Sequence, residues 1–279
     1  MNEEAYDQLA RIFKPLGSRA CPIYMKDERG HVILVGTGIP VDYGEHGMLI
    51  TATHVLEDLR GKSIIVGGAK VLHSFPLVCS GFSSRGEGTI DVDVAAVAIP
   101  PEVVIEMMGF YHFTTATELG NVDGQDKYTL YAFVGCPHSR NKSKPFSEKR
   151  IQPYFFTTNT FCNLDGVKTA GKSEVTHFAM RFSLVKTMGR GHQYVQAAQP
   201  DGISGCGVWK VRFDPNTGAP AEPKLVGVGI EHVTKSNAFV ATHIGAAAIA
   251  IKSLGEDLDA GKMKGIGLEI RPSDKELST

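Results

Sequence analysis

Three residue types that support nucleophilic catalysis occur at three well-separated places in the chain. His54 follows the apolar run Met48–Thr51, Asp93 precedes the apolar run Val94–Ile99, and Ser204 lies in a loop between glycines. A serine hydroxyl is a weak nucleophile unless a neighbouring imidazole removes its proton. The imidazole needs a carboxylate at its other ring nitrogen, which fixes its tautomer and orientation. These residue types in this arrangement predict a Ser–His–Asp site.

Besides an activated nucleophile, acyl transfer requires stabilisation of an oxyanion. The composition of the loop around Ser204 fits this requirement. Backbone N–H groups are ready-made donors for that charge. Gly202 permits a backbone turn that points its own N–H and the N–H of Ser204 at one spot. We therefore expect Gly202 and Ser204 to form an oxyanion hole.

Two neighbouring residues compete for these roles. Asp91 lies two residues before Asp93 and hence on the same face of a strand, so either carboxylate could orient the histidine. Cys206 is a rival nucleophile, although it is better interpreted as a small packed side chain. Ser204 itself also fits plain turn chemistry, because serine between glycines is common in loops.

The elements that must position these residues are short strands separated by turn residues, without alternating long helices. This pattern indicates an all-β barrel or sandwich. The apolar spacing also predicts a helix over residues 3–14, and the alanine-rich stretch predicts another over residues 239–260. The expected strands are His31–Val35, Gly36–Val41, Met48–Thr51, Ser63–Val66, Val94–Ile99, Tyr128–Val134, Tyr154–Thr158, His177–Leu184, Tyr194–Ala198, Val208–Phe213 and Leu225–Ile230.

Composition limits the class of protein. The 279 residues carry 29 Lys+Arg and 30 Asp+Glu, so a nucleic-acid or anionic-membrane partner is not expected. The five cysteines form no CxxC pair and the histidines show no metal-ligand spacing, so neither a metal nor another cofactor is predicted. The N-terminus lacks a basic and apolar leader, and no apolar run is long enough to span a membrane, which favours a cytoplasmic protein.

Several motifs together resemble the trypsin-like (chymotrypsin-fold) serine peptidases, especially their bacterial intracellular members. The resemblance starts from Thr51–Val55, Asp93–Val97 and Gly202–Gly207, in the order His, Asp, Ser. Flanking matches extend it over about residues 30–255; they are Gly36–Ile39, Gly47–Thr51, Gly135–Pro137, Leu225–Gly229 and Phe239–Thr242.

The resemblance implies two six-stranded antiparallel Greek-key barrels with the site between them. It makes His54 the general base, Asp93 the orienting acid and Ser204 the nucleophile. The implied organisation is a helical extension over 1–20, a first barrel over 21–137, a polar linker over 138–149, and a second barrel with the C-terminal helix over 150–279. It places Ala198 at the base of the substrate pocket, with Ile230, Glu231 and His232 on the strand that pairs with substrate.

One departure from the family pattern concerns activation. Ile203 stands where secreted relatives carry an aspartate that pairs with a newly cut N-terminus, so activation by such a cut is not expected. The expected partner is a protein or peptide substrate, and a regulatory protein partner is a further candidate.

The leading hypothesis is thus a serine endopeptidase. An alternative is a catalytically inactive member of the same fold that binds a peptide along Leu225–His232 by strand addition. A third hypothesis is a P-loop NTPase, because Gly166–Ser173 matches G-x-x-x-x-G-K-S in full. The P-loop hypothesis is disfavoured because the flanking sequence is that of a hairpin loop, with a β-type run after it.

Overall fold

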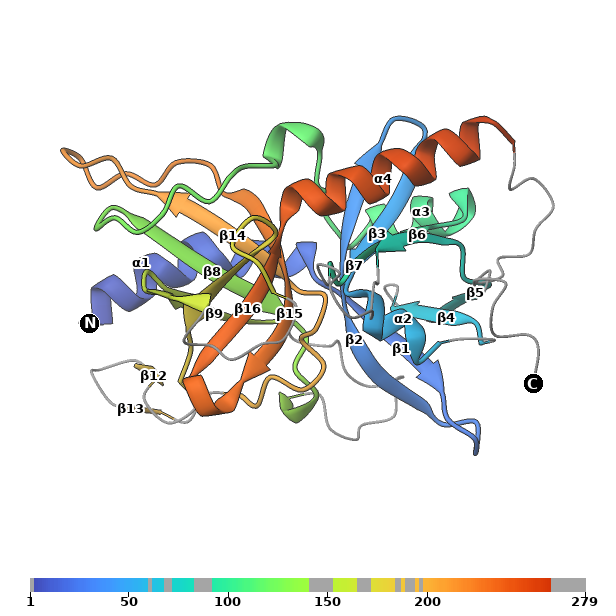
Figure 1. Ribbon diagram of the computed structural model, residues 1–279, viewed down its shortest axis with the longest axis horizontal. Helices are drawn as coiled ribbons and strands as arrows, with labels where there is room; N and C mark the ends of the chain where they lie inside the picture. The colour runs from blue at the N-terminus through green and yellow to red at the C-terminus, as the bar shows by residue number, and fades with distance from the viewer. Residues whose placement is uncertain are drawn as a thin grey trace.

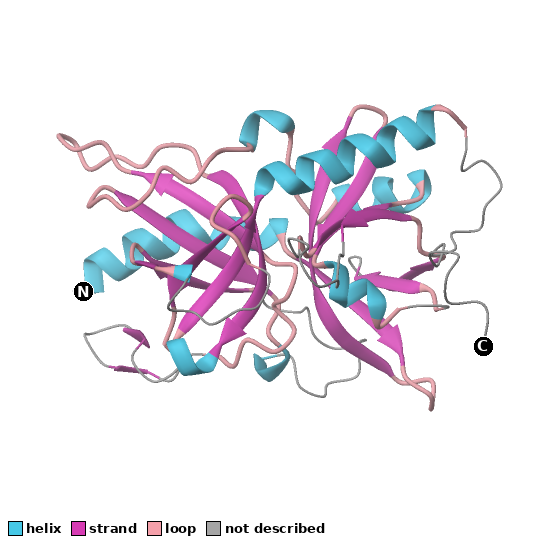
Figure 2. Cartoon of the chain, viewed as in Figure 1, coloured by secondary structure: helices cyan, strands magenta, loops and turns pink. Residues whose placement is uncertain are grey.

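Strands dominate the architecture, as Figures 1 and 2 show. The computed structural model describes residues 3–59, 62–67, 72–82, 92–140, 153–164, 172–183, 187–188, 194–195 and 198–261. Two seven-stranded antiparallel sheets, each curled into a half-barrel, lie side by side. The predicted all-β double-barrel fold with a helix near each end is confirmed, although each sheet has seven strands where six were expected.

The first sheet has the strand order β5-β4-β1-β2-β3-β7-β6. Its long strand β2 pairs with β1 on one side and with β3 on the other, so it spans the sheet's centre. The strands are β1 (Cys21–Lys26), β2 (Val32–Tyr43), β3 (His46–Thr51), β4 (Ile64–Gly67), β5 (Leu72–Phe75), β6 (Cys79–Phe82) and β7 (Val94–Ala98).

The second sheet has the order β10-β11-β16-β15-β14-β8-β9. A separate pair consists of β12 (Thr187–Met188) and β13 (Tyr194–Val195). The sheet's strands are β8 (Thr129–Gly135), β9 (Tyr154–Thr158), β10 (Phe161–Cys162), β11 (His177–Arg181), β14 (Gly207–Arg212), β15 (Lys224–Val233) and β16 (Ala238–His243).

The helices are few and lie outside the sheets. They are α1 (Glu3–Phe13), η1 (Lys14–Arg19), α2 (Thr53–Glu57), α3 (Pro101–Met108), η2 (Ala116–Glu118), η3 (His138–Arg140), η6 (Thr234–Ser236) and α4 (Ile244–Asp259). No helix in the described part of the chain is long and apolar enough to cross a membrane.

Two expected boundaries are wrong. β8 hydrogen-bonds to β14 and β9, so residues 129–135 belong to the second sheet although the first barrel was expected to extend to residue 137. The C-terminal helix begins at Ile244, because residues 239–243 pair with both β15 and β11 as part of β16. Most of the expected linker 138–149 lies outside the described residues; its first three residues form η3.

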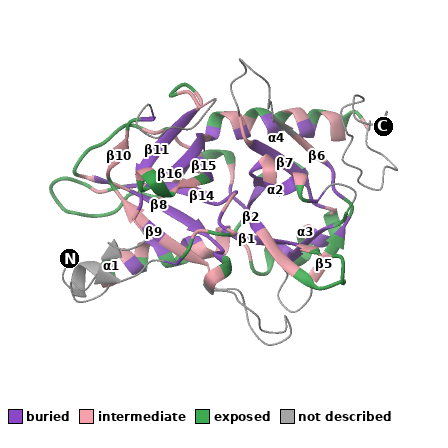
Figure 3. Cartoon of the chain, turned by 60° about the horizontal axis from the view of Figure 1, so that its bottom comes forward, coloured by how far each residue is buried: buried purple, intermediate pink, exposed green. Residues whose placement is uncertain are grey.

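The two halves share an apolar core. One buried cluster joins Ile50 of β3 to Trp209 of β14 and to Leu254 of α4. A second cluster joins Leu49 of β3 to Ile230 of β15. Helix α4 leaves β16 and crosses β3, β6 and β7, with a buried face against them (Figure 3). Burial of apolar surface from both sheets in the same clusters couples the two halves.

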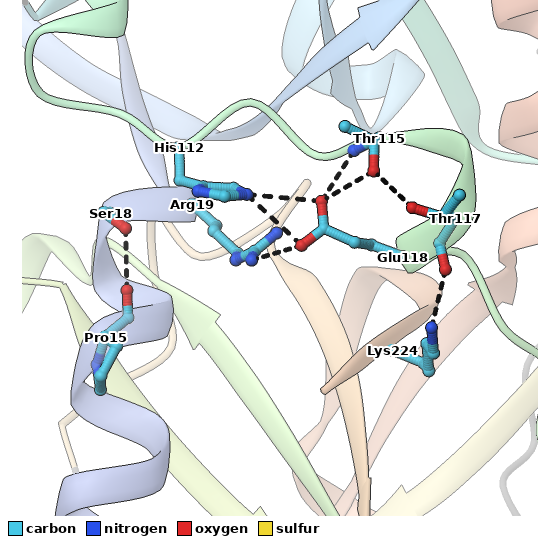
Figure 4. A network of polar contacts seen from close by, with 8 residues as sticks. All are labelled: Pro15, Ser18, Arg19, His112, Thr115, Thr117, Glu118 and Lys224. Carbon is cyan, nitrogen blue, oxygen red and sulfur yellow. Dashed lines mark hydrogen bonds and ion pairs between the residues drawn. The ribbon is translucent and has the colours of Figure 1, made fainter. Parts of the chain in front are cut away.

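The N-terminal segment is attached to this core by an ion pair and a cation–π contact of Arg19. Figure 4 shows the ion pair with Glu118 and the polar contacts around it. Arg19 pairs with Glu118 at 2.5 Å, and its guanidinium lies 4.8 Å from the centre of the Trp209 ring. His112 also contacts Glu118. Burial acts to raise the pKa of Glu118, but hydrogen bonds and charge from Arg19 outweigh it and lower that pKa to about 2. The carboxylate therefore stays ionised and holds η1 against the segment that joins the two sheets.

Candidate active site

His54 is positioned by the end of a buried strand. β3 ends at Thr51, Ala52 is extended, and the short helix α2 then begins at Thr53. Val55 and Leu56 are buried in the core of the first sheet, which fixes the helix. The His54 side chain remains one-third exposed. A partly exposed imidazole on a fixed helix is suited to proton transfer.

Asp93 is brought to His54 by strand register. β7 pairs with β3 so that Thr51 lies opposite Ala95, and continuing this pairing places Asp93 beside the first residue of α2. The Asp93 carboxylate accepts two hydrogen bonds from His54. The ring Nδ1 lies 2.5 Å from Oδ2, and the backbone N lies 3.0 Å from Oδ1. The carboxylate thus fixes both the ring and the backbone of the same residue.

The electrostatics of this pair favour an ionised aspartate. Burial acts to raise the pKa of Asp93, but the hydrogen bonds from His54 and the charges of His54 and Lys172 lower it overall. Burial acts to lower the pKa of His54, but Asp93, with the nearby carboxylates of Asp58 and Glu57, raises it above its ordinary value of 6.5. Asp93 therefore supports a protonated imidazole, the state that a general base reaches during catalysis.

Asp93 is the carboxylate that the structure places on His54. The rival Asp91 lies outside the described residues. The choice of Asp93 therefore rests on its two hydrogen bonds to His54.

The Ser204 loop is a pair of turns that require glycine. The Ile203 amide donates to Pro200 O at 2.9 Å, with Gly202 at φ +87° between them. Gly205 has φ +85°, and a Cβ there would lie 2.1 Å from oxygen atoms of both β2 and β3. Positive φ and contact this close exclude a side chain at Gly205. The loop is thereby packed directly against the strand end that leads to His54.

Ser204 itself lies at the junction of the two sheets. Its backbone O accepts a hydrogen bond from Thr37 N of β2 at 2.8 Å, and its Oγ donates to Ile230 O of β15 at 3.4 Å. Gly36 lies between the Ser204 carbonyl and the side chain of Val55, which follows His54. Among the hydrogen bonds of the described residues, none joins Ser204 Oγ to His54. The structure joins His54 and Asp93 directly, whereas the Ser204 hydroxyl donates to a different acceptor, Ile230 O.

The predicted oxyanion donors are the amides of Gly202 and Ser204. Within the described chain, neither the Gly202 N–H nor the Ser204 N–H donates to a backbone carbonyl. Gly202 has φ +87°, so the turn that carries these amides depends on glycine. Their role as oxyanion donors stays a prediction.

Next to Ser204, β15 changes its pairing. β15 pairs with β14 only as far as Val228, whereas residues 231–233 continue to pair with β16 on the other edge. Glu231 is exposed. The described part of the chain places no strand on the β14 side of residues 230–233, and Ile230 O accepts a hydrogen bond from the Ser204 hydroxyl.

The other predicted pocket residues lie in an aromatic cluster. Ala198 is buried with Phe182 and Phe239. The His232 ring packs edge-on against Phe182 at 4.9 Å, and its buried Nε2 has no hydrogen-bond partner among the described residues. Burial lowers the pKa of His232, although the charge of Asp201 opposes the shift. This shift of the pKa favours the neutral form of the His232 imidazole.

Cys206, the competing nucleophile, is buried in a way that disfavours its reactive thiolate form. Cys206 is fully buried next to Gly229, and burial raises the pKa of its thiol to about 12. The thiolate is the reactive form of cysteine, so this residue serves packing. All five cysteines are unpaired, and the described residues contain no group of three or more His, Cys, Asp or Glu that could hold a metal ion.

The P-loop hypothesis fails on the element that follows the motif. Gly166 to Gly171 lie outside the described residues, whereas Lys172 and Ser173 are described. A turn and then strand β11 follow Ser173, where a phosphate-binding loop requires a helix.

Sequence reasoning missed two contributors. Thr37 hydrogen-bonds to the Ser204 loop through both its backbone and its side chain, and the charge of Lys172 acts on Asp93. The glycines on both sides of Thr37 were a signal that another backbone approaches there.

In comparisons with known proteins, no family model matches this chain and no curated protein sequence matches it significantly.

Proposed function

We propose that this protein is a serine endopeptidase of the trypsin-like type. The observation that carries the proposal is the pair of hydrogen bonds from His54 to Asp93, at the point where a glycine-bounded serine from the other sheet approaches. The resemblance of the flanking motifs to that family agrees with the double-barrel fold.

In this proposal Ser204 Oγ attacks the carbonyl carbon of a peptide bond, and its proton passes to His54 Nε2. Asp93 holds the resulting imidazolium through Nδ1. The oxyanion of the tetrahedral intermediate accepts hydrogen bonds from the Gly202 and Ser204 amides. His54 then gives the proton to the leaving amine, and water removes the acyl group from Ser204 by the reverse sequence. The substrate lies along the free edge of β15 at Ile230–His232.

The pure protein tests this proposal through its reaction with a fluorophosphonate probe. We expect wild type to be labelled and Ser204→Ala to lose labelling by roughly 10³-fold or more. Ser139→Ala is a matched control, because the Ser139 hydroxyl also donates to a backbone carbonyl in a loop, at 3.3 Å. Labelling of wild type and Ser139→Ala alone supports the peptidase. A folded wild-type protein that resists the probe would overturn it.

The second candidate is a peptide-binding module without catalysis. It is favoured by one observation, which is that Ser204 Oγ bonds to Ile230 O instead of His54. This candidate predicts that an extended peptide binds at the β15 edge with equal affinity in wild type and Ser204→Ala, and leaves uncleaved. Appearance of a new N-terminus in the peptide, absent with Ser204→Ala, would eliminate it.

A further inference from the structure

Thr37 is a buried polar residue at the contact between the two sheets. It lies in β2 with no exposed surface. Its Oγ1 donates to Gly202 O at 2.9 Å and accepts from Cys136 N at 2.9 Å. Its backbone N donates to Ser204 O at 2.8 Å. One residue of the first sheet thus makes three hydrogen bonds to two separate segments of the second half.

A second threonine connects this centre to the histidine. Thr51 Oγ1 donates to Thr37 O at 2.8 Å, and Thr51 ends β3 directly before the helix that carries His54. Because Gly205 has no side chain, the loop can lie close to Thr37 O and Thr51 Oγ1. A continuous series of hydrogen bonds therefore runs from the His54 side of the site to the Ser204 side.

The bonds from Thr37 act on the groups whose direction matters most. Gly202 and Ser204 each contribute an amide to the predicted oxyanion hole, and Thr37 holds the carbonyl of each. Peptide units are planar, so the Gly202 carbonyl shares its plane with the Ile203 N–H, and the Ser204 carbonyl shares its plane with the Gly205 N–H. Holding both carbonyls therefore fixes the peptide unit on either side of the one that carries the Ser204 N–H.

Only a hydroxyl can make both hydrogen bonds of the Thr37 side chain. Thr37 Oγ1 must donate to the carbonyl of Gly202 and accept from the amide of Cys136 at the same time, and a hydroxyl has one donor and two acceptor sites. A methyl group of similar shape would leave a buried carbonyl and a buried amide unpaired. No charge is involved, so the arrangement does not depend on pH in the physiological range.

We propose that Thr37 is the positioning residue of the Ser204 loop, and that its side-chain hydroxyl fixes the position of the loop by holding the Gly202 carbonyl. The catalytic part of this inference rests on the proposed peptidase function. Ile203 is buried and uncharged. The hydrogen bonds that hold this part of the loop are therefore those from Thr37 of β2 to the neighbouring residues, Gly202 and Ser204.

The test compares Thr37→Val with Thr37→Ser and with Thr114→Val. Serine keeps the hydroxyl, and valine removes it at nearly constant volume. Thr114 is also fully buried, and its hydroxyl has no hydrogen-bond partner in the described part of the chain, so it controls for burial of a threonine. Two quantities are measured for each variant: amide hydrogen exchange at Cys136 and in the Ser204 loop, and the second-order rate of fluorophosphonate labelling.

The labelling step reports the oxyanion donors directly. Ser204 Oγ attacks phosphorus, its proton passes to His54, the P–F bond breaks and fluoride leaves, while the phosphoryl oxygen takes the place of the oxyanion. For Thr37→Val we expect labelling about 10- to 100-fold slower, because a small misplacement of such groups has effects of that size. Exchange at Cys136 and in the loop should be about tenfold faster, since the local hydrogen bonds are lost.

The controls and outcomes separate the inference from the proposed function. Thr37→Ser should stay within about threefold of wild type in labelling because its hydroxyl can make the same bonds, and Thr114→Val should match wild type in both measurements. Loop exchange in Thr37→Val equal to that of wild type would overturn the positioning role. If wild type itself is not labelled, the peptidase proposal fails, while the exchange comparison still decides the role of Thr37.

Should Thr37→Val not fold, Thr37→Ser and Thr37→Cys decide the question instead. Cysteine offers only a weak S–H donor and a weak acceptor. It should therefore resemble the valine variant in loop exchange, whereas serine should resemble wild type. Equal exchange in the serine and cysteine variants would overturn the inference.

Discussion

Replacement of Asp93 by asparagine is the sharpest test of the assigned carboxylate. The amide of Asp93→Asn has only one oxygen, so it can accept only one of the two hydrogen bonds that the carboxylate accepts from His54. If the amide oxygen accepts from the His54 backbone N–H, the NH₂ group faces Nδ1 and forces the ring proton onto Nε2. That tautomer cannot accept the proton of Ser204. The variant is therefore folded and correctly assembled but holds the imidazole in the wrong state.

The size of the effect follows from the alternative orientation. Turning the amide so that its oxygen accepts from Nδ1–H points the NH₂ group at the His54 backbone N–H, where two donors meet. Leaving a buried donor unsatisfied costs about 1–3 kcal/mol, which reduces the useful tautomer by about 5- to 150-fold. Loss of the carboxylate charge that stabilises the imidazolium adds to this. We expect fluorophosphonate labelling near pH 7 to fall by about 10⁴-fold in total.

The pH profile gives an independent reading of the same change. In wild type, burial acts to lower the pKa of His54, but Asp93 holds it above 6.5, and labelling needs the neutral imidazole. Labelling should therefore rise as pH increases through that raised pKa. In Asp93→Asn the effect of burial prevails and the midpoint should move to lower pH. Asp91→Asn is the matched control and should leave both rate and midpoint unchanged. Loss of labelling in Asp91→Asn with retention in Asp93→Asn would refute the assignment.

Two further predictions concern the groups that hold the site in place. Gly205→Ala puts a methyl group 2.1 Å from two oxygens at φ +85°. We expect the free energy of unfolding, measured by chemical denaturation, to fall by about 2–5 kcal/mol. A fall of less than about 1 kcal/mol would contradict the described packing. Glu118 has a pKa lowered from 4.5 to about 2, so the stability that its ionised form adds is complete above pH 4.5 and lost as pH falls toward 2. Glu118→Gln should remove about 1–2 kcal/mol at neutral pH and flatten this acid limb, after allowance for partial solvent screening; an unchanged dependence between those pH values would show that Arg19 does not stabilise the carboxylate.

The fold class was predictable because each buried strand requires a short run of apolar residues, and such runs can be recognised in the sequence. β7, for example, is buried at every position and was expected almost as found, at residues 94–99. The segment 239–243 was misread because it shares small apolar residues with the helix after it. Its pairing with β11 and β15 on both edges decided its state, and such partners are remote in sequence. Helix α3 was missed, although proline at its start and Glu102 in its first turn are helix-start signals.

The site was predictable to the extent that local sequence records it. His54 and Asp93 flank paired strands, so an antiparallel register was enough to bring them together. The role of Thr37 was not accessible in this way. The flanking glycines indicate that another backbone approaches Thr37, but its partners at Cys136 and Gly202 are 99 and 165 residues away, and the local pattern does not identify them.

The backbone around Ser204 is held in place, whereas its hydroxyl is held weakly. Its carbonyl is fixed by Thr37 and its loop is packed against β3 through Gly205. The hydroxyl, by contrast, makes one long hydrogen bond of 3.4 Å to Ile230 O, near the limit at which such a bond contributes. Rotation of the side chain about χ1 exchanges this weak contact for another acceptor without moving either sheet. Since Leu49 of the first sheet and Ile230 of the second share one buried cluster, separating the halves would expose apolar surface, whereas turning one hydroxyl would not. A change at the Ser204 hydroxyl is therefore less costly than a separation of the two halves.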